Sequence, residues 1–239
     1  GNFDVLPVAA EIIEIEELDQ GINKMARRIS GLLENVRQEK EMQHLTELQL
    51  IQAQVNPHFL YNTLDVISGL TLIGTDDAVE MISSLSIFFR TSLSKGNDII
   101  PLAEEKRHTL SYLEIQQFRY HDILEFELSI PKEMDVIQVP KLSIQPLAEN
   151  ALYHGIKNRR GKGKITITGR EEENAIVLTV SDNGQGMTPE RLHEVQEAIR
   201  TGERAGFGLA AVAERIALYY GPGYGMTISS EEGIGTTVE

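Results

Sequence analysis

The chain has 239 residues, of which 41% are apolar, and this is enough for one or two domains with a real hydrophobic core. Its formal net charge of -14 disfavours nucleic acid and anionic lipid as general partners. The absence of cysteine excludes disulfides and thiolate metal sites, and the six histidines lack the spacing of a zinc site. No apolar run approaches the roughly 18 residues that would cross a membrane.

An apolar seam runs through residues 11–36, where the spacing alternates between three and four residues. Its members are Ile15, Leu18, Ile22, Met25, Ile29, Leu32 and Val36. This a/d heptad pattern favours a parallel homodimeric coiled coil, although an amphipathic helix packed on its own domain would give the same spacing. The seam lapses over residues 37–44 and resumes in a new phase from Leu45 to Val66. We interpret this break as a place where rotation could pass between helical segments.

The resumed helical pattern contains Pro57 directly before His58, in the stretch QVNPHFLYN. A proline inside a helix removes one backbone hydrogen bond and costs about 3 kcal/mol. A second helix is expected near residues 76–95 after the GTDD turn, and a third after Pro101. Up to about residue 120 the chain therefore reads as almost all helix.

Beyond residue 120 strands and helices alternate. Strands are expected at 126–130, 164–169, 175–182, 224–230 and 235–239, and helices at 142–156, 188–200 and 208–220. This order predicts an α/β sandwich in which one sheet carries helices on one face. The expected fold class is therefore α+β, with the boundary near residue 120.

Two polar segments of this second half suggest chemistry. In IQPLAENALYHGI, residues 144–156, Asn150 and His154 are one helical turn apart, and an asparagine carbonyl is a hard oxygen ligand that suits Mg²⁺ bound to phosphates. Polar helix residues are usually just solvated, so this signal is weak alone. In VSDNGQGM, residues 180–187, Asp182 ends an apolar strand and could accept a hydrogen bond from an exocyclic amine, while Gly184 and Gly186 let the backbone approach a ring. An ordinary Asp-Asn-Gly turn is the alternative.

A third segment, GERAGFGLAAVAERIALYYG at residues 202–221, places Gly206 and Gly208 before a helix that starts near Leu209. Free N–H groups at the positive end of a helix suit phosphate, although a flexible loop plus a cap would look the same. No Walker A motif occurs, which excludes the P-loop class. The basic run KNRRGKGK, residues 157–164, is interpreted as a solvated loop.

Taken together and in this order, the three segments resemble the N, G1 and G2 boxes of the GHKL ATP-binding fold. The stretch QVNPHFLYN resembles the phosphoacceptor box of the LytS/YesM-type sensor histidine kinases, and PLAEEKRHTLSYLEIQQFRY fits the same family. Residues 2–29 resemble the end of a HAMP signalling module. The resemblance implies a HAMP end and signalling helix over 1–40, dimerisation and histidine phosphotransfer helices over 41–120, and a GHKL (Bergerat) ATP-binding domain over 121–239.

In that family His58 would be the phosphoacceptor, and ATP with Mg²⁺ would be the cofactors. Asp182 would bind the adenine amine, Asn150 would bind Mg²⁺, and Gly184 and Gly186 would border the adenine. Phosphates would lie at Gly206, Gly208 and Leu209, under a mobile lid formed by residues 187–205. Tyr153 stands where many histidine kinases have lysine, so His154 or a basic residue of 157–164 would have to substitute for it.

The resemblance also implies partners. Two helical hairpins, one per subunit, would form a four-helix bundle in a homodimer, and the phosphoryl group would pass to an aspartate of a separate response regulator. The chain begins without methionine and stops at GTTVE, so we expect a cytoplasmic piece of a longer membrane protein. Its membrane segments would lie outside this sequence.

The residues themselves support a simple chemistry at His58. A neutral imidazole is the nucleophile that phosphoryl transfer needs, and an unperturbed histidine is mostly neutral at pH 7.5. Asn62, one turn on, could orient the ring or the incoming phosphoryl group. Phe59 stands where other kinases have an acidic residue, which leaves the general base open. We hypothesise that Pro57 bends the helix and lets it switch between two geometries.

Two other functions fit parts of the sequence. One is a GHKL ATPase or degenerate kinase that binds ATP without phosphorylating itself. The other is a non-enzymatic dimeric scaffold built on the long coiled coil.

Overall fold

The computed structural model describes residues 24–25, 28–29, 31, 57–73, 76–92, 98–157, 159, 161–173, 175–201, 208–221 and 223–239. The chain divides into two compact units, Gly1–Asn56 and Pro57–Glu239. The five described residues of the first unit are helical, and among them Met25 and Ile29 of the heptad seam are exposed. The rest of that seam and its phase break at 37–44 lie outside the described residues.

The second unit begins with two helices, α2 (Pro57–Ile73) and α3 (Asp77–Ser92). Each buries one apolar face, to which Phe59 and Ile67 of α2 and Met81, Leu85 and Phe88 of α3 contribute. Asp77 and Glu80 lie in the first turn of α3, where negative charge favours the helix. The helix expected near 76–95 is thus confirmed. Pro57 is the first residue of α2, and the bend proposed around it involves residues outside those described.

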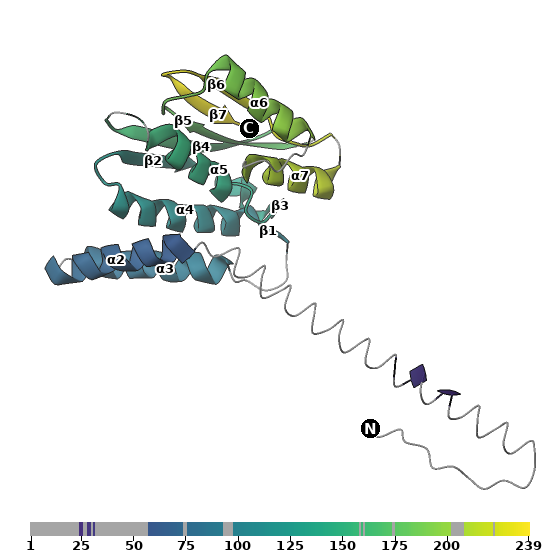
Figure 1. Cartoon of the computed structure of the whole chain (residues 1–239), viewed down its shortest axis with the longest axis horizontal. Helices are drawn as coiled ribbons and strands as arrows, with labels where there is room; N and C mark the ends of the chain where they lie inside the picture. Colours follow the sequence, from purple (N-terminus) through teal and green to yellow (C-terminus); the bar gives the residue numbers. More distant parts are fainter. Residues whose placement is uncertain are drawn as a thin grey trace, which may run out of the picture. The chain divides into compact units, whose positions relative to one another are not determined.

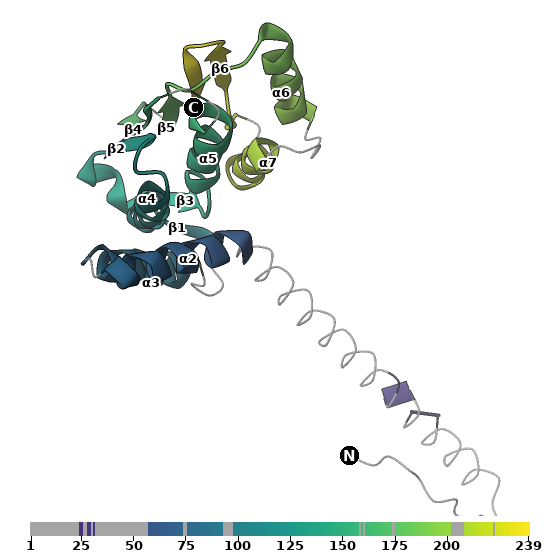
Figure 2. The same ribbon diagram turned by 60° about the vertical axis from the view of Figure 1, so that its left-hand side comes forward.

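Helix α4 (Leu102–Arg119) lies between the α2–α3 pair and the sheet in both views (Figures 1 and 2). It buries side chains on both sides and is therefore the central element of this unit. Towards α3, its His108 ring stacks on Phe88 with 4.7 Å between centroids, and its Glu114 carboxylate accepts a 2.6 Å hydrogen bond from Ser84. Burial lowers the pKa of His108 to about 4, so its ring packs in the neutral form at neutral pH.

Two short strands flank α4, and the sequence did not indicate either of them. Strand β1 (Ile99–Pro101) pairs antiparallel with β3 (Gln138–Pro140), with Ile100 opposite Val139. A 3₁₀ turn, η1 (Lys132–Val136), precedes β3. Strand β1 lies in the interval between the two helices expected here, so the prediction of almost all helix up to residue 120 holds for α2, α3 and α4 and missed only this short strand. The residue before a proline favours extended backbone, and the partner strand lies about forty residues away in the chain.

The main sheet has five strands in the order β2-β4-β5-β7-β6. Strand β2 (Leu124–Ser129) runs parallel to β4 (Gly163–Glu171), and the remaining neighbours, which involve β5 (Ile176–Asp182), β7 (Gly235–Val238) and β6 (Ile228–Glu231), are antiparallel. All five expected strands are present. Strand β6 is shorter than its prediction, because residues 224–227 precede it without strand geometry.

The helices of this part lie on one face of the sheet, as the α/β sandwich predicted (Figure 1). They are α5 (Gln145–Asn150), α6 (Pro189–Thr201) and α7 (Gly208–Tyr220). A π-helical segment, η2 (Ala151–Ile156), continues α5. The core beneath them contains Ile165, Ile167 and Val180 from the sheet and Leu152 and Leu209 from the helical side. The expected fold class, helices followed by a mixed α/β domain, is confirmed.

No helix among the described residues combines the length and the hydropathy that a membrane span needs.

Candidate nucleotide-binding and phosphoacceptor sites

Asp182 is the last residue of β5 and is 7% exposed. Its Oδ1 atom accepts a 2.8 Å hydrogen bond from the backbone N–H of Gly184. Burial raises the pKa of Asp182 to about 6, against the opposing effect of the N–H groups of Gly184 and Thr236. At neutral pH the carboxylate is therefore mostly ionised and desolvated, and its second oxygen is suited to accept a hydrogen bond from a ligand amine.

The turn after Asp182 lies in close contact with the end of the α5–η2 segment. A Cβ at Gly184 would overlap the backbone of Gly155, and a Cβ at Gly155 would overlap the Asp182 carboxylate. Two hydrogen bonds from Gln185 stabilise this contact. Its backbone N–H donates to the Gly155 carbonyl at 3.1 Å, and its side-chain amide donates to the His154 carbonyl at 3.0 Å. The sequence indicated Gly184 but not Gly155, whose only signal was a glycine at the end of a helical pattern.

At position 186 both the backbone conformation and the available space favour glycine. The φ angle of Gly186 is +67°, and a Cβ there would overlap the carbonyl of Glu231, the last residue of β6. The Gln185 carbonyl accepts a 2.6 Å hydrogen bond from Gly233, in the turn between β6 and β7. The segment that follows Asp182 is therefore held between η2 and the β6–β7 turn, which gives the candidate site a defined wall.

Asn150 is the last residue of α5 and is half-buried. The residues after it form a π-helical turn, in which the N–H of Lys157 donates to the carbonyl of Leu152 at 2.9 Å. Asn150 and His154 thus lie on one helical stretch, as predicted, although the helix widens from α to π geometry between them. Such π turns are frequent at functional sites, and no residue pattern in the sequence indicated this one.

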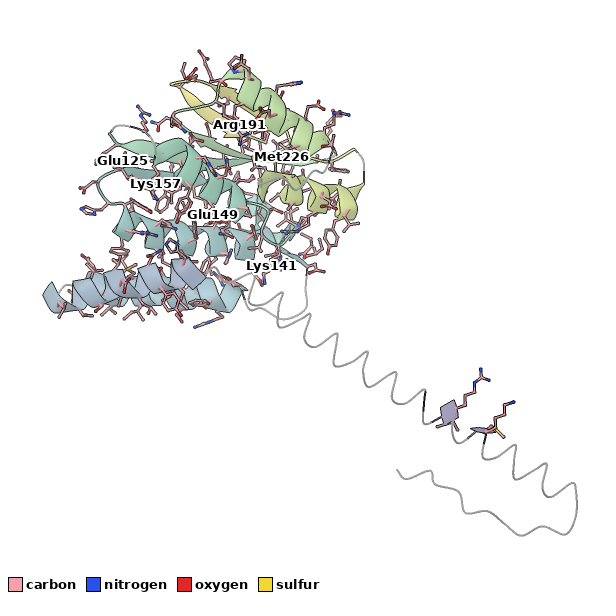
Figure 3. All side chains as sticks on the ribbon, in the orientation of Figure 1. Glu125, Lys141, Glu149, Lys157, Arg191 and Met226 are labelled. Atoms are coloured by element: carbon pink, nitrogen blue, oxygen red, sulfur yellow. The ribbon has the colours of Figure 1, made fainter. Side chains whose placement is uncertain are left out.

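A cationic and aromatic cluster lies beside this turn. The ammonium group of Lys157 is 5.3 Å from the ring centroid of Tyr153 and 5.9 Å from that of Tyr120. Figure 3 labels Lys157 and Glu149, which flank the π-helical segment. Burial raises the pKa of Glu149 above its ordinary value. A positive charge is thus present next to Tyr153, the position at which the resemblance expected a lysine.

The rest of the basic run behaves largely as a solvated loop. Lys162 forms an exposed ion pair with Glu125 at 3.1 Å, and Lys164 forms one with Glu127 at 2.6 Å. Arg159 donates a hydrogen bond to the carbonyl of Asn183, in the turn after Asp182. The backbone of Lys164 also contacts this turn, since its N–H donates to Asn183 Oδ1 at 2.7 Å and its carbonyl accepts from the N–H of Asn183 at 3.2 Å. Lys157, Arg159 and Lys164 of this run therefore lie next to the region of the candidate nucleotide site.

The third predicted segment begins α7. Gly208 is its first residue and is exposed, whereas Leu209 is 1% exposed and packs in the core. Gly206 lies outside the described residues. Most of the expected mobile lid at 187–205 is the helix α6, whose Val195 and Ala198 are buried and whose Gln196 donates to the Ile228 carbonyl at 3.1 Å. The helix expected at 188–200 is confirmed, and the role of residues 187–205 as a mobile lid stays a prediction.

His58 is exposed in the first turn of α2, and the next residue is buried. The Phe59 ring contacts Phe88 of α3 and Tyr112 of α4, with centroids 5.0 and 5.6 Å away. Phe59 thus anchors the helix, which explains an aromatic residue after the histidine and leaves the imidazole accessible. Asn62 is half-buried, and its amide nitrogen is buried with no hydrogen-bond partner among the described residues. Its role in orienting His58 stays a prediction.

The residues around Asp182 fit an adenine nucleotide. A desolvated carboxylate and closely approaching glycines suit a flat ring that carries an amine, and α7 starts with exposed backbone. Magnesium fits only as an ion shared with a ligand, because no cluster of three or more acidic or histidine side chains in the described part of the chain could hold a metal. Asn150 would then supply one oxygen, and the phosphates of the nucleotide would supply others.

Comparisons with known proteins agree with this geometry. Residues 46–124 match the family model of the histidine kinases, and residues 140–239 match that of the histidine kinase-, DNA gyrase B- and HSP90-like ATPases. The chain belongs to the histidine kinase family and carries both of the domains that define a protein histidine kinase. The predicted resemblance to the sensor histidine kinases and to the GHKL ATP-binding fold is therefore confirmed, whereas the end of a HAMP module stays a prediction.

Two curated relatives are similar over most of the chain. The sensor histidine kinase YesM of Bacillus subtilis is 36% identical over 222 residues, which are 92% of this chain, and the sensor protein LytS of the same organism is 31% identical over 225 residues, which are 93%. This chain spans 37% of the length of YesM and 38% of that of LytS. Among solved structures, the catalytic domain of the histidine kinase ThkA aligns with 59% of this chain and 90% of its own, at 16% identity and a TM-score of 0.43.

Proposed function

We propose that this chain is the kinase core of a two-component sensor histidine kinase that uses ATP to phosphorylate itself on His58. The observation that carries the proposal is the combination, in one chain, of an exposed histidine on an anchored helix and a buried aspartate that is followed by two closely packed glycines. The names of YesM and LytS as sensor proteins support the signalling role. The phosphoryl group would then pass to an aspartate of a separate response regulator.

In this proposal Asp182 accepts a hydrogen bond from the adenine amine, and Gly184 and Gly186 border the ring. The phosphates extend towards Asn150 and towards the start of α7 at Gly208 and Leu209, with Gly206 of the preceding segment also contributing N–H groups. Magnesium held with Asn150 supplies charge neutralisation on the phosphates. Lys157, next to Tyr153, is the cation that takes the place of the missing lysine.

The reaction at His58 needs no covalent chemistry beyond one exchange of bonds. The lone pair of the neutral imidazole attacks the γ-phosphorus, so that an N–P bond forms while the bond from that phosphorus to the bridging oxygen of ADP breaks. An accessible ring is the main requirement, and the buried Phe59 provides it by fixing the helix on α3 and α4. Because α4 lies between α2 and the sheet, the γ-phosphate reaches His58 either from a partner subunit or after the nucleotide domain moves (Figure 1).

We further propose a homodimer that is built on the α2–α3 pair. Both helices expose large apolar side chains, namely Tyr61, Leu64, Leu72, Val79 and Ile82. On α2 they follow a helical stripe, and burying such residues against a second copy would complete a four-helix bundle. The end of a HAMP module over residues 2–29 is part of this proposal, and the first HAMP helix and the membrane segments would belong to the longer protein.

Labelling with ATP that carries a radioactive γ-phosphate tests the proposal. With Mg²⁺ the protein should incorporate label that is lost in acid and kept in base, and His58→Ala should abolish it. His121→Ala is the matched control, because the His121 side chain is 74% exposed and lies outside both sites. Measurable ATP binding without any label would favour the degenerate kinase or ATPase, and the absence of ATP binding would favour the scaffold.

A further inference from the structure

The turn formed by residues 141–144 precedes α5 and joins three elements of the fold. Leu142 has a φ angle of +61°, and it is the one residue other than glycine with a positive φ in the described part of the chain. A leucine in this left-handed region is strained by roughly 1 to 3 kcal/mol, so the surrounding contacts must hold it there. Two charged side chains that the sequence did not single out provide those contacts.

The first is Glu105, in the first turn of α4 and fully buried. One of its carboxylate oxygens accepts a 2.9 Å hydrogen bond from the N–H of Leu142, and the other accepts a 2.8 Å hydrogen bond from the N–H of Ile144. Helix α5 has no cap from a side chain of its own N-terminal residues. Glu105, which belongs to α4, therefore accepts the hydrogen bonds of two backbone N–H groups at the start of α5.

The second is Arg215, on α7. Its guanidinium donates to the carbonyl of Lys141 at 2.6 Å and to the carbonyl of Leu142 at 3.2 Å. Glu105 thus binds the N–H groups of the turn and Arg215 binds its carbonyls. Because these backbone groups alternate along only four residues, the two side chains fix both the position and the direction of the turn.

The turn connects the two halves of the candidate nucleotide site. Helix α5 ends at Asn150, less than two turns after it starts, and α7 begins at Gly208, about two turns before Arg215. We propose that Glu105 and Arg215 are positioning residues that set α5 against α7 through this turn, and so place Asn150 opposite the phosphate-binding start of α7. This inference rests on the proposed ATP-binding function.

Alternatively, Glu105 and Arg215 could contribute only to overall stability, and three measurements separate the two roles. The first is the affinity for Mg²⁺ with a non-hydrolysable ATP analogue, measured by calorimetry at a temperature at which circular dichroism shows each variant to be folded. Glu105→Gln keeps one acceptor and leaves one buried N–H unsatisfied, so affinity should fall by about tenfold. Glu105→Ala should lose more, and Arg215→Gln about as much as Glu105→Gln.

Matched controls lie next to the tested residues. Glu104→Gln removes the adjacent carboxylate of α4, and Arg107→Gln removes an exposed guanidinium of the same helix. Both should bind the analogue within about twofold of wild type, since neither residue is among those whose side chains hydrogen-bond to the turn. The double variant of Glu105→Gln and Arg215→Gln should lose less affinity than the product of the two single losses, because both act on one turn.

The second measurement is amide hydrogen exchange without nucleotide. Peptides that cover residues 141–150 should exchange faster in Glu105→Gln, whereas peptides of α2 and α3 should not change. This result does not depend on ATP, so it tests the contact even if the wild type fails to bind nucleotide, which would overturn the proposed function instead.

The third measurement is the free energy of unfolding of each variant. Wild-type affinity in Glu105→Gln and Arg215→Gln, together with exchange that rises evenly over the whole unit, would show a purely structural role and overturn the inference. If Glu105→Ala does not fold, the glutamine variants still decide the question.

Discussion

Replacing Asp182 by asparagine should make the protein more stable while it removes nucleotide binding. Burial raises the pKa of this carboxyl from its ordinary value of 3.8 to about 6. Each pKa unit corresponds to about 1.4 kcal/mol, so the ionised side chain destabilises the folded state by up to about 3 kcal/mol at pH 8. Asparagine carries no charge and can still accept the hydrogen bond from Gly184, so Asp182→Asn should recover much of this difference.

The direction of the Asp182 pKa shift determines how the stability gained by Asp182→Asn depends on pH. A raised carboxyl pKa means that the folded state binds the proton more tightly, so the penalty is absent below about pH 4 and complete above about pH 6. The stability gained by Asp182→Asn, measured by urea unfolding, should therefore be largest at pH 8 and about half as large at pH 5. Asp122→Asn is the control, because the Asp122 side chain is 82% exposed and its removal should have little effect at either pH.

Nucleotide binding should change in the opposite direction. In Asp182→Asn the side-chain amide oxygen would keep the hydrogen bond from the Gly184 N–H. The amide NH₂ group would then occupy the position of the second carboxylate oxygen, and it cannot accept a hydrogen bond from the adenine amine. Losing a hydrogen bond to a charged group costs about 1.5 to 3 kcal/mol, so ATP affinity should fall by roughly 10- to 100-fold in calorimetry. A variant that is less stable than wild type at pH 8, or one that binds ATP equally well, would refute the reasoning about Asp182.

Three further results are expected. Gly184→Ala should abolish ATP binding and lower the melting temperature, because the new Cβ overlaps the backbone of Gly155; unchanged ATP affinity would contradict the tight approach. Phe88→Ala should lower the free energy of unfolding by about 3 to 5 kcal/mol in urea, since a buried ring that joins α2, α3 and α4 is removed; a loss below about 1 kcal/mol would argue against this core. Asn150→Ala should raise the Mg²⁺ concentration needed for half-maximal autophosphorylation, while adenosine binding stays the same; an unchanged Mg²⁺ requirement would exclude Asn150 as a ligand.

Much of this fold could be predicted because its patterns are local. The alternation in KITITG and AIVLTVSD indicated β4 and β5. The aspartate that ends β5 and the glycines after it indicated the wall of the candidate nucleotide site. The helical spacing around α3 and α7 was also visible in the sequence, because one face of each is regularly apolar. Helix α4 was expected from the helical stretch that follows Pro101.

The features that were missed depend on contacts between distant residues. Strand β1 is three residues long, which is too short for an alternating pattern of apolar and polar residues, and only its pairing with β3 identifies it as a strand. Glu105 reads as an ordinary acidic residue of a first helical turn, and only its contacts with residues 37 and 39 positions away reveal its role. The π-helical turn after Asn150 contains Gly155, which packs against Asp182 and Gly184, and a periodic pattern cannot show such a contact.

The central claim is that ATP phosphorylates this chain on His58, and mapping the phosphoryl group tests it most directly. The protein would be incubated with ATP and Mg²⁺, digested at alkaline pH so that phosphohistidine survives, and analysed by mass spectrometry. We expect the phosphoryl group on the peptide that contains His58 and on no peptide that contains any of the other five histidines. A phosphoryl group on a different residue would contradict the account, as would an unmodified His58 peptide from a protein that binds ATP and has received radioactive label.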